Sequence, residues 1–184
     1  MPNAVLYLLA LDEKLLLNVQ DRIRRPKLNI WMQRISALGN AGILWLVCAA
    51  VLLLIPGQRL TGIVVVCAQL VGVLLTNCLL KHLVARKRPF HKLKQLRPLI
   101  ELPKDWSFPS GHTTSSVSAA LILMCGLPLY AGIPALIMGL MIAFSRMYVG
   151  VHYPSDILGG AVMGVFSAWA GSSLVERAAA VWFS

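Results

Sequence analysis

Long apolar runs separated by short charged segments make up most of the chain. These runs cover residues 41–56, 60–80, 117–126, 129–144 and 157–175. A helix needs about 20 apolar residues to cross a bilayer core, so the second and fifth runs are long enough by themselves. The polar residues 38–40 can extend the first run, and the small residues within 107–118 can extend the third. The pattern predicts an all-α fold, an integral membrane helical bundle with about five transmembrane helices.

The N-terminal segment carries a different pattern. Between Leu15 and Ile35, apolar residues recur near helical spacing beside a series of arginines and lysines, and Pro26 divides the segment in two. This pattern is typical of amphipathic helices that lie in the membrane interface, although helices packed against the protein's own spans would show it too. The apolar patch Val5–Leu11 is too short to span a membrane and follows no basic region, so we do not expect a signal peptide.

We expect one membrane domain over residues 1–184, with interfacial helices in 1–38 and the transmembrane bundle in 39–184. Hydrophobic residues make up 58% of the chain and charged residues 13%, and the mean hydropathy is +0.73, outside the usual soluble range. The formal net charge of +10 would also suit nucleic acid. Because the charges lie between apolar runs, where they meet anionic headgroups or phosphorylated substrates, we expect membrane lipids as partners and no nucleic acid.

Two features of the apolar runs concern packing rather than chemistry. The four cysteines all lie inside these runs without the spacing of a zinc site, so we interpret them as small core residues. Gly160 and Gly164 form a GxxxG pattern on the last run. That pattern allows close helix packing within one chain or between two, which leaves a homodimer open.

The first of three charged clusters, KHLVARKRP, follows the second apolar run at residues 81–89. Lys81 and Arg88 are seven positions apart, about two helical turns, which predicts that they share a helix face. A charge at the bilayer centre costs roughly 2.5–3.5 kcal/mol, which predicts that both lie at the membrane boundary. Taken alone, this cluster also fits an ordinary basic flank of a membrane span.

The second cluster, FPSGHTTSS, occupies residues 108–116. Ser110 is a candidate N-cap, and Gly111 would let the backbone approach a ligand closely. The free N–H groups of the first turn form a natural anion site beside His112. Taken alone, the same residues fit plain helix capping.

The third cluster, SRMYVGVHYPSD, occupies residues 145–156. We expect Pro154 to begin the last helix, with Asp156 in its first turn and Arg146 at the end of the preceding helix. His152 would then lie close enough to Asp156 for the carboxylate to hold one ring nitrogen as a donor. The other nitrogen would present its lone pair as a nucleophile or base. Taken alone, a capping aspartate and an interfacial histidine explain this cluster too.

The three clusters become more specific when they are considered together. If the chain crosses the membrane at each apolar run, all three emerge on the same side. Three cations, a helix N-terminus, two histidines and a carboxylate suit a phosphoryl group, whose transition state spreads negative charge over its oxygens. Charge-assisted hydrogen bonds are worth roughly 1.5–3 kcal/mol each, so several of them could supply a large part of the reduction in activation free energy that an enzyme achieves.

The chain resembles the type 2 phosphatidic acid phosphatase family. The residues Lys81-x6-Arg88-Pro89, then Pro109-Ser110-Gly111-His112, then Ser145-Arg146-x5-His152-x3-Asp156 look like its three signature motifs. The resemblance implies that His152 attacks phosphorus and forms a phosphohistidine, that Asp156 orients His152, and that His112 protonates the departing oxygen and later activates water.

The resemblance further implies a set of residues that hold the phosphate oxygens, namely Lys81, Arg88, Ser110, Gly111 and Arg146. It implies no cofactor, and no metal either, in keeping with a sequence that has no carboxylate cluster suited to magnesium. The neighbouring basic residues of the first cluster fall outside the motif, so they receive no role. They are His82, Arg86, Lys87 and His91.

A lipid phosphate is the expected substrate. Small bacterial members of the family commonly act on undecaprenyl diphosphate or phosphatidylglycerophosphate. The 18-residue loop between Arg88 and Ser107 adds four basic residues, which favours undecaprenyl diphosphate, with phosphatidylglycerophosphate or phosphatidic acid as the alternative. Vanadium-dependent haloperoxidases share the motifs but are soluble and much larger. A lipid-binding or transport protein without activity would also fit five spans.

The orientation in the membrane involves a conflict. Fifteen of the seventeen Lys and Arg residues, all but Arg59 and Arg177, would lie on the side of the three clusters. The positive-inside rule directs that side toward the cytoplasm, whereas members of the family usually place their site outside it. We expect a multi-pass protein of the cell membrane whose active site faces outside the cytoplasm.

Overall fold

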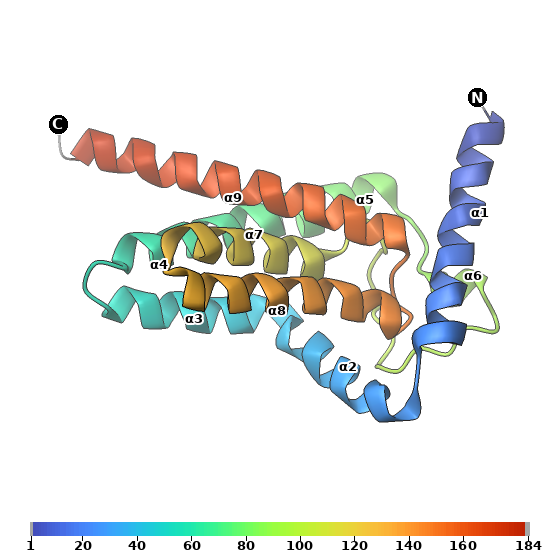
Figure 1. Cartoon of the computed structure of the whole chain (residues 1–184). Helices are drawn as coiled ribbons and strands as arrows, with labels where there is room; N and C mark the ends of the chain where they lie inside the picture. Colours follow the sequence, from blue (N-terminus) through green and yellow to red (C-terminus); the bar gives the residue numbers. More distant parts are fainter. Residues whose placement is uncertain (1, 183–184) are drawn as a thin grey trace.

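The computed structural model describes residues 2–182, and every regular element within them is helical. Helix α1 (Pro2–Asn18) continues into a π-helical turn, η1 (Val19–Ile23), and lies crosswise at one end of the bundle (Figure 1). Helix α2 (Pro26–Leu38) has Pro26 in its first turn, where the missing N–H leaves no hydrogen bond unmade. The predicted break at Pro26 is therefore correct, and α2 packs against one of the long helices, α8.

The helices that cover the apolar runs pack along one another, and short helices connect them (Figure 1). They are η2 (Asn40–Gly42), α3 (Ile43–Leu54), α4 (Arg59–Val73), the π-helical η3 (Leu74–Leu80), α5 (Lys81–Val84), α6 (Pro89–Lys92), α7 (Gly111–Gly126), α8 (Leu129–Tyr148) and α9 (Pro154–Trp182). The α3–α4 and α7–α8 connections lie at one end of the bundle. Helix α5, the start of α7 and the α8–α9 connection lie at the other end, next to α1 (Figure 1).

Fewer helices than expected are long enough to cross a membrane. Within the described residues three qualify by length and composition, Arg59–Lys92, Leu129–Tyr148 and Pro154–Ala180, and the bent pair α2 and α3 adds a fourth if it is one span. The expected count of five differs because α7 has only 16 residues. It lies between α4, α8 and α9, so its neighbours cover much of this short helix.

Small residues allow α7 to lie close to its neighbours. A Cβ added at Gly160 would lie 2.7 Å from the Ser110 carbonyl oxygen, and one added at Gly164 would lie 2.8 Å from Val117 Cβ. The Thr114 hydroxyl also donates to the Gly160 carbonyl oxygen at 3.1 Å. The GxxxG pattern of α9 therefore serves packing within the chain, and the possible homodimer stays a prediction.

Candidate active site

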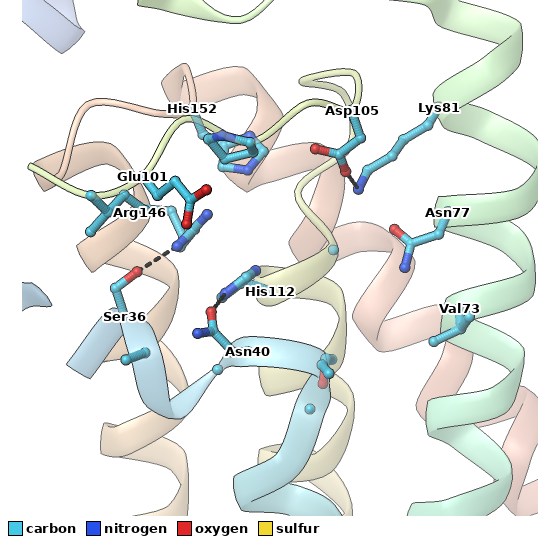
Figure 2. A pocket seen from close by; sticks show the side chains of 18 of the residues that line it. Ser36, Asn40, Val73, Asn77, Lys81, Glu101, Asp105, His112, Arg146 and His152 are labelled. Atoms are coloured by element: carbon cyan, nitrogen blue, oxygen red, sulfur yellow. Dashed lines mark hydrogen bonds and ion pairs between the residues drawn. The ribbon is translucent and has the colours of Figure 1, made fainter. Parts of the chain in front are cut away.

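A cavity of about 910 Å³ lies at one end of the bundle, lined by residues of η3, α7, α8 and the loop before α7. Six of the eight predicted site residues line it, namely Lys81, Arg88, Gly111, His112, Arg146 and His152. Figure 2 shows His112, His152 and Arg146 around a common space, with Lys81 reaching toward it from the opposite wall. The structure thus brings residues from all three motifs together at one end of the bundle.

The predicted helix face shared by Lys81 and Arg88 is wrong. Helix α5 stops because Ala85 adopts left-handed backbone with φ 45° and ψ 41°. Arg88 is extended, with φ −68° and ψ 155°, as expected for a residue that precedes a proline. The two side chains reach the same cavity because the chain turns after α5 and not because they lie on one helix.

Asp105, in the loop before α7, joins these two cations. Its Oδ2 accepts a hydrogen bond from Lys81 Nζ at 2.5 Å (Figure 2). Its Oδ1 accepts one from Arg88 Nη2 at 2.6 Å. Partial burial alone would raise the pKa of Asp105. The hydrogen bond from Lys81 and the charges of Arg88 and Lys81 outweigh that effect and lower the pKa to about 2. An ionised carboxylate therefore lies between two of the predicted phosphate ligands.

His152 lies in the connection between α8 and α9, with 1% of its surface exposed. Its Nε2 is 3.1 Å from Arg88 Nη1, and because a guanidinium can only donate, Nε2 carries the lone pair and Nδ1 the proton. The Nδ1 atom is 3.5 Å from Asp156 Oδ2. Burial lowers the pKa of His152 to about 4, with Asp156 opposing this effect and the charges of Arg88 and Arg146 adding to it. A neutral ring with an available Nε2 is the form required of a nucleophile.

Asp156 lies in the first turn of α9, as predicted, and is fully buried. Its Oδ2 accepts hydrogen bonds from the Ser107 hydroxyl and from Tyr153 N, the latter at 2.8 Å. Its Oδ1 accepts one from Arg86 Nη1 at 2.7 Å. Partners on both oxygens fix the carboxylate, so that Oδ2 faces His152.

His112 lies in the first turn of α7 and faces the cavity (Figure 2). Its Nε2 is 2.9 Å from Asn40 Oδ1. A Cβ added at Gly39 would lie 2.8 Å from His112 Cδ2 and 2.6 Å from Ile142 Cγ2. Asn40 and Gly39 both lie at the bend between α2 and α3, so this bend leaves room for the His112 ring and holds it through one polar contact.

Ser110 caps α7, as predicted, but does not line the cavity. Its hydroxyl accepts from Thr113 N and from the Thr113 hydroxyl, at 3.4 and 3.0 Å, and none of its surface is exposed. Gly111 does line the cavity, and a Cβ there would lie 3.0 Å from Asn77 Oδ1 and 3.7 Å from Lys81 Nζ. The backbone of α7 can therefore approach a ligand closely at Gly111, whereas Ser110 acts on the helix start.

Arg146 lies in the last turn of α8 with 3% of its surface exposed. Its Nη1 donates to the Ser36 hydroxyl (Figure 2). Its Nε is buried and has no hydrogen-bond partner within residues 2–182. A buried guanidinium with a free donor at the cavity wall suits an anionic ligand, because such a group is costly when it stays unpaired.

One wall of the cavity is apolar. It is formed by side chains of α3 and α4, Leu46, Val66, Leu70 and Val73. Leu70 and Val73 are exposed on the bundle surface as well. The cavity therefore combines a cationic end with an apolar side, as a lipid that carries a phosphate headgroup requires.

Sequence reasoning missed several residues around this site. The sequence analysis gave no role to Asp105 or to Arg86, which lies beside the motif positions. Asn40 and Asp12 lie far from the three charged clusters along the chain, so their contacts with residues of those clusters could not be predicted from spacing. Among residues 2–182, no three His, Cys, Asp or Glu side chains gather in a way that could hold a metal ion.

Comparison with known proteins identifies the family. The model of the PAP2 superfamily matches residues 61–179. The chain is 32% identical over 120 residues to an undecaprenyl-diphosphatase of Sulfolobus acidocaldarius, covering 65% of this chain and 58% of that protein. It is 34% identical over 145 residues to a decaprenylphosphoryl-5-phosphoribose phosphatase of Mycobacterium tuberculosis, covering 77% of both.

A solved structure agrees with these relatives. The transmembrane PAP2 type phosphatidylglycerolphosphate phosphatase of Bacillus subtilis is 26% identical and superposes with a TM-score of 0.70, covering 93% of this chain and 87% of that one. The family model alone covers more than half of this chain. The chain therefore belongs to the PAP2 superfamily and is a membrane-embedded phosphoric ester hydrolase, a lipid phosphatase.

Proposed function

We propose that this protein hydrolyses a polyprenyl diphosphate, undecaprenyl diphosphate in the first instance, to the monophosphate without a metal ion. The observation that carries the proposal is the cavity in which Lys81, Arg88, Arg146, His112 and His152 meet beside an apolar wall. The cations would hold the phosphoryl oxygens while the prenyl chain stays against apolar side chains. Backbone donors at Gly111 would complete the phosphate site.

In the first step, His152 Nε2 attacks the terminal phosphorus atom. An N–P bond forms, and the bond from phosphorus to the bridging oxygen breaks. His112 protonates that oxygen, which leaves as part of the lipid monophosphate. The contacts of Asp156 support this role, because a carboxylate facing Nδ1 stabilises the positive charge that the ring gains on attack.

In the second step, water displaces His152 from the phosphorus atom. His112, now without its proton, takes a proton from the water, whose oxygen attacks the phosphohistidine. The N–P bond breaks, inorganic phosphate is released, and His152 recovers its lone pair. Arg88 contacts both Asp105 and His152 Nε2, so substrate binding must exchange these contacts for phosphate oxygens before attack can occur.

The substrate assignment has two sources of support. Two relatives are named for polyprenyl phosphate substrates, the undecaprenyl-diphosphatase and the decaprenylphosphoryl-5-phosphoribose phosphatase. Lys104 lines the cavity as an additional cation near the three motif cations, which suits a diphosphate. Phosphatidylglycerophosphate is the second candidate, because the similar Bacillus subtilis structure is a phosphatase for that lipid.

Phosphate release from the purified protein tests the proposal. The panel should contain undecaprenyl diphosphate, phosphatidylglycerophosphate, phosphatidic acid and a water-soluble ester. We expect the highest kcat/KM for undecaprenyl diphosphate, inhibition by vanadate, no effect of a chelator, and loss of activity in His152→Ala. Activity that disappears with the chelator would contradict the metal-free mechanism. Absence of phosphate release from every lipid would instead favour a lipid-binding or transport protein.

We further propose that the active site faces outside the cytoplasm. A cysteine placed at Lys94, in the basic loop of the catalytic end, should react with a membrane-impermeant reagent in whole cells. A parallel cysteine at Arg59, at the opposite end of the bundle, should be protected until lysis. The reverse pattern would place the site inside, as the distribution of positive charge predicts.

A further inference from the structure

Arg86 lies beside the catalytic end, and the proposed chemistry does not use it. It follows the left-handed turn at Ala85 and contacts two carboxylates. Its Nη1 donates to Asp156 Oδ1 at 2.7 Å and to the Ser155 hydroxyl at 2.6 Å. Its Nη2 donates to Asp12 Oδ2 at 2.6 Å. Arg86 thus bridges the N-terminal helix and the carboxylate that faces His152.

The two oxygens of Asp156 have different partners. Arg86 contacts Oδ1, whereas Oδ2 faces His152 and accepts from Tyr153 N. Asp156 is fully buried, and a buried carboxylate without a cation is strongly destabilised as an ion. His152 alone does not supply that cation, because burial keeps its ring neutral. Arg86 therefore brings a full positive charge into direct contact with Asp156.

Asp12 holds Arg86 from the other side. It is 6% exposed, whereas residues 6–11, which precede it on α1, are exposed. Besides Arg86, it accepts from Ser155 N at 2.9 Å and from the Ser155 hydroxyl. Ser155 N belongs to the first turn of α9, one residue before Asp156, so Asp12 ties α1 to the helix start that carries the catalytic carboxylate.

Apolar packing supports the same arrangement. The Arg86 guanidinium lies 4.1 Å from the centre of the Tyr153 ring, and Tyr153 packs in a buried cluster with Leu16 of α1. An aromatic face favours a cation above it. The guanidinium is thus fixed by two carboxylates and one ring, which limits its movement.

We propose that Arg86 and Asp12 are positioning residues that keep Asp156 ionised and aimed at His152, so that docking of α1 completes the catalytic centre. This proposal rests on the proposed phosphatase function. Arg86 acts on the reaction through Asp156 and does not touch the phosphoryl group, so its loss affects kcat and leaves phosphate binding intact.

The test uses the full-length protein with undecaprenyl diphosphate, phosphate release as the assay and vanadate as the probe of the anion site. In Arg86→Gln, we expect kcat to fall about tenfold or more while the vanadate inhibition constant changes by less than about twofold. The acid limb of kcat should move to higher pH, because Asp156 takes up a proton more readily without its counter-ion. Arg86→Lys should have a higher kcat than Arg86→Gln, because lysine restores the positive charge although it lacks the two-pronged donor geometry of the guanidinium.

A substitution at Asp12 tests the proposal independently, and a substitution at the neighbouring Glu13 is the matched control. Asp12→Asn should lower kcat by a smaller factor than Arg86→Gln, and in the Arg86→Gln background it should cause less than about a twofold further loss. Glu13→Gln, which removes the next acid of α1 and its contact with Lys92, should leave kcat and the pH profile unchanged. If Arg86→Gln does not fold, Arg86→Lys and Asp12→Asn still test the shift of the acid limb.

The outcomes separate this proposal from the phosphatase function. A wild-type protein that releases no phosphate would overturn the function itself. An active wild type with equal kcat in Arg86→Gln, or with multiplicative losses in the double variant, would overturn the positioning role alone. A loss of vanadate affinity that matches the loss of kcat would assign Arg86 to phosphate binding and would also overturn the proposal.

Discussion

Replacing Asp105 with asparagine should make the protein bind phosphate analogues more tightly. The Asp105 carboxylate contacts Lys81 Nζ at 2.5 Å and Arg88 Nη2 at 2.6 Å, so it competes with a phosphoryl group for two cations. Asparagine keeps the size of the side chain and the backbone carbonyl that accepts from Arg88 Nε at 2.9 Å. The substitution therefore removes the negative charge with little change of shape.

The magnitude follows from the pKa of Asp105, which falls from 3.8 to about 2. At about 1.4 kcal/mol per pKa unit, this shift corresponds to roughly 2.5 kcal/mol of attraction to the cations. The side chain is 50% exposed, so solvent screening reduces the attraction to about 1 kcal/mol. We expect the inhibition constant of vanadate to fall by about fivefold, the factor that corresponds to about 1 kcal/mol.

Competitive inhibition of phosphate release, measured with vanadate between pH 5 and pH 8, checks this prediction. Asp105 stays ionised throughout that range, because its pKa is about 2. The ratio of the vanadate inhibition constants of wild type and Asp105→Asn should therefore be the same at each pH. Glu101→Gln is the matched control, since Glu101 lines the same cavity and forms no salt bridge within residues 2–182. Weaker vanadate binding in Asp105→Asn would refute the reasoning and would mean that the carboxylate positions the cations.

Three further results are expected. The acid limb of kcat/KM that reports His152 should lie near pH 4 and not near 6.5. The pKa of His152 is lowered to about 4, so the neutral nucleophile is lost only as the pH falls through that value. An acid limb near pH 6.5 would contradict the assignment of His152 as the nucleophile. Gly39→Ala should lower kcat about tenfold because its Cβ would lie 2.8 Å from His112 Cδ2, and a melting curve will show whether the fold survives. Gly111→Ala should raise the vanadate inhibition constant several-fold, since its Cβ would lie 3.0 Å from Asn77 Oδ1 and close to Lys81; unchanged inhibition would exclude a close approach of the ligand at this position.

Fewer helices pass the length test than the five spans expected, for a physical reason. Hydropathy correctly located the five helices that pack lengthwise. It could not show that α7 has 16 residues and that its polar first half, including Thr113 and Ser116, is buried among other helices. Such residues can be satisfied inside a bundle, for example through the contact of Trp45 Nε1 with the Ser116 hydroxyl at 3.0 Å.

Lys81 and Arg88 do not share a helix face because the helix that holds Lys81 ends at Val84, before Arg88. A residue before proline disfavours helical backbone, and this local rule gives the better prediction for Arg88. The local arguments for Ser110 and Pro154 were correct, because capping and proline at a helix start depend on nearest neighbours. Local chemistry could therefore be predicted from the sequence where it involved only adjacent residues.

The sequence alone determined the membrane-helical class and the motif residues that gather at one end, because apolar run length and motif spacing are properties of the chain. The tertiary structure decided which distant groups complete the site. Asp12, Asn40 and Asp105 contact Arg86, His112 and Lys81 across 74, 72 and 24 positions of sequence. Contacts over such separations depend on how the helices pack, and no local pattern encodes them.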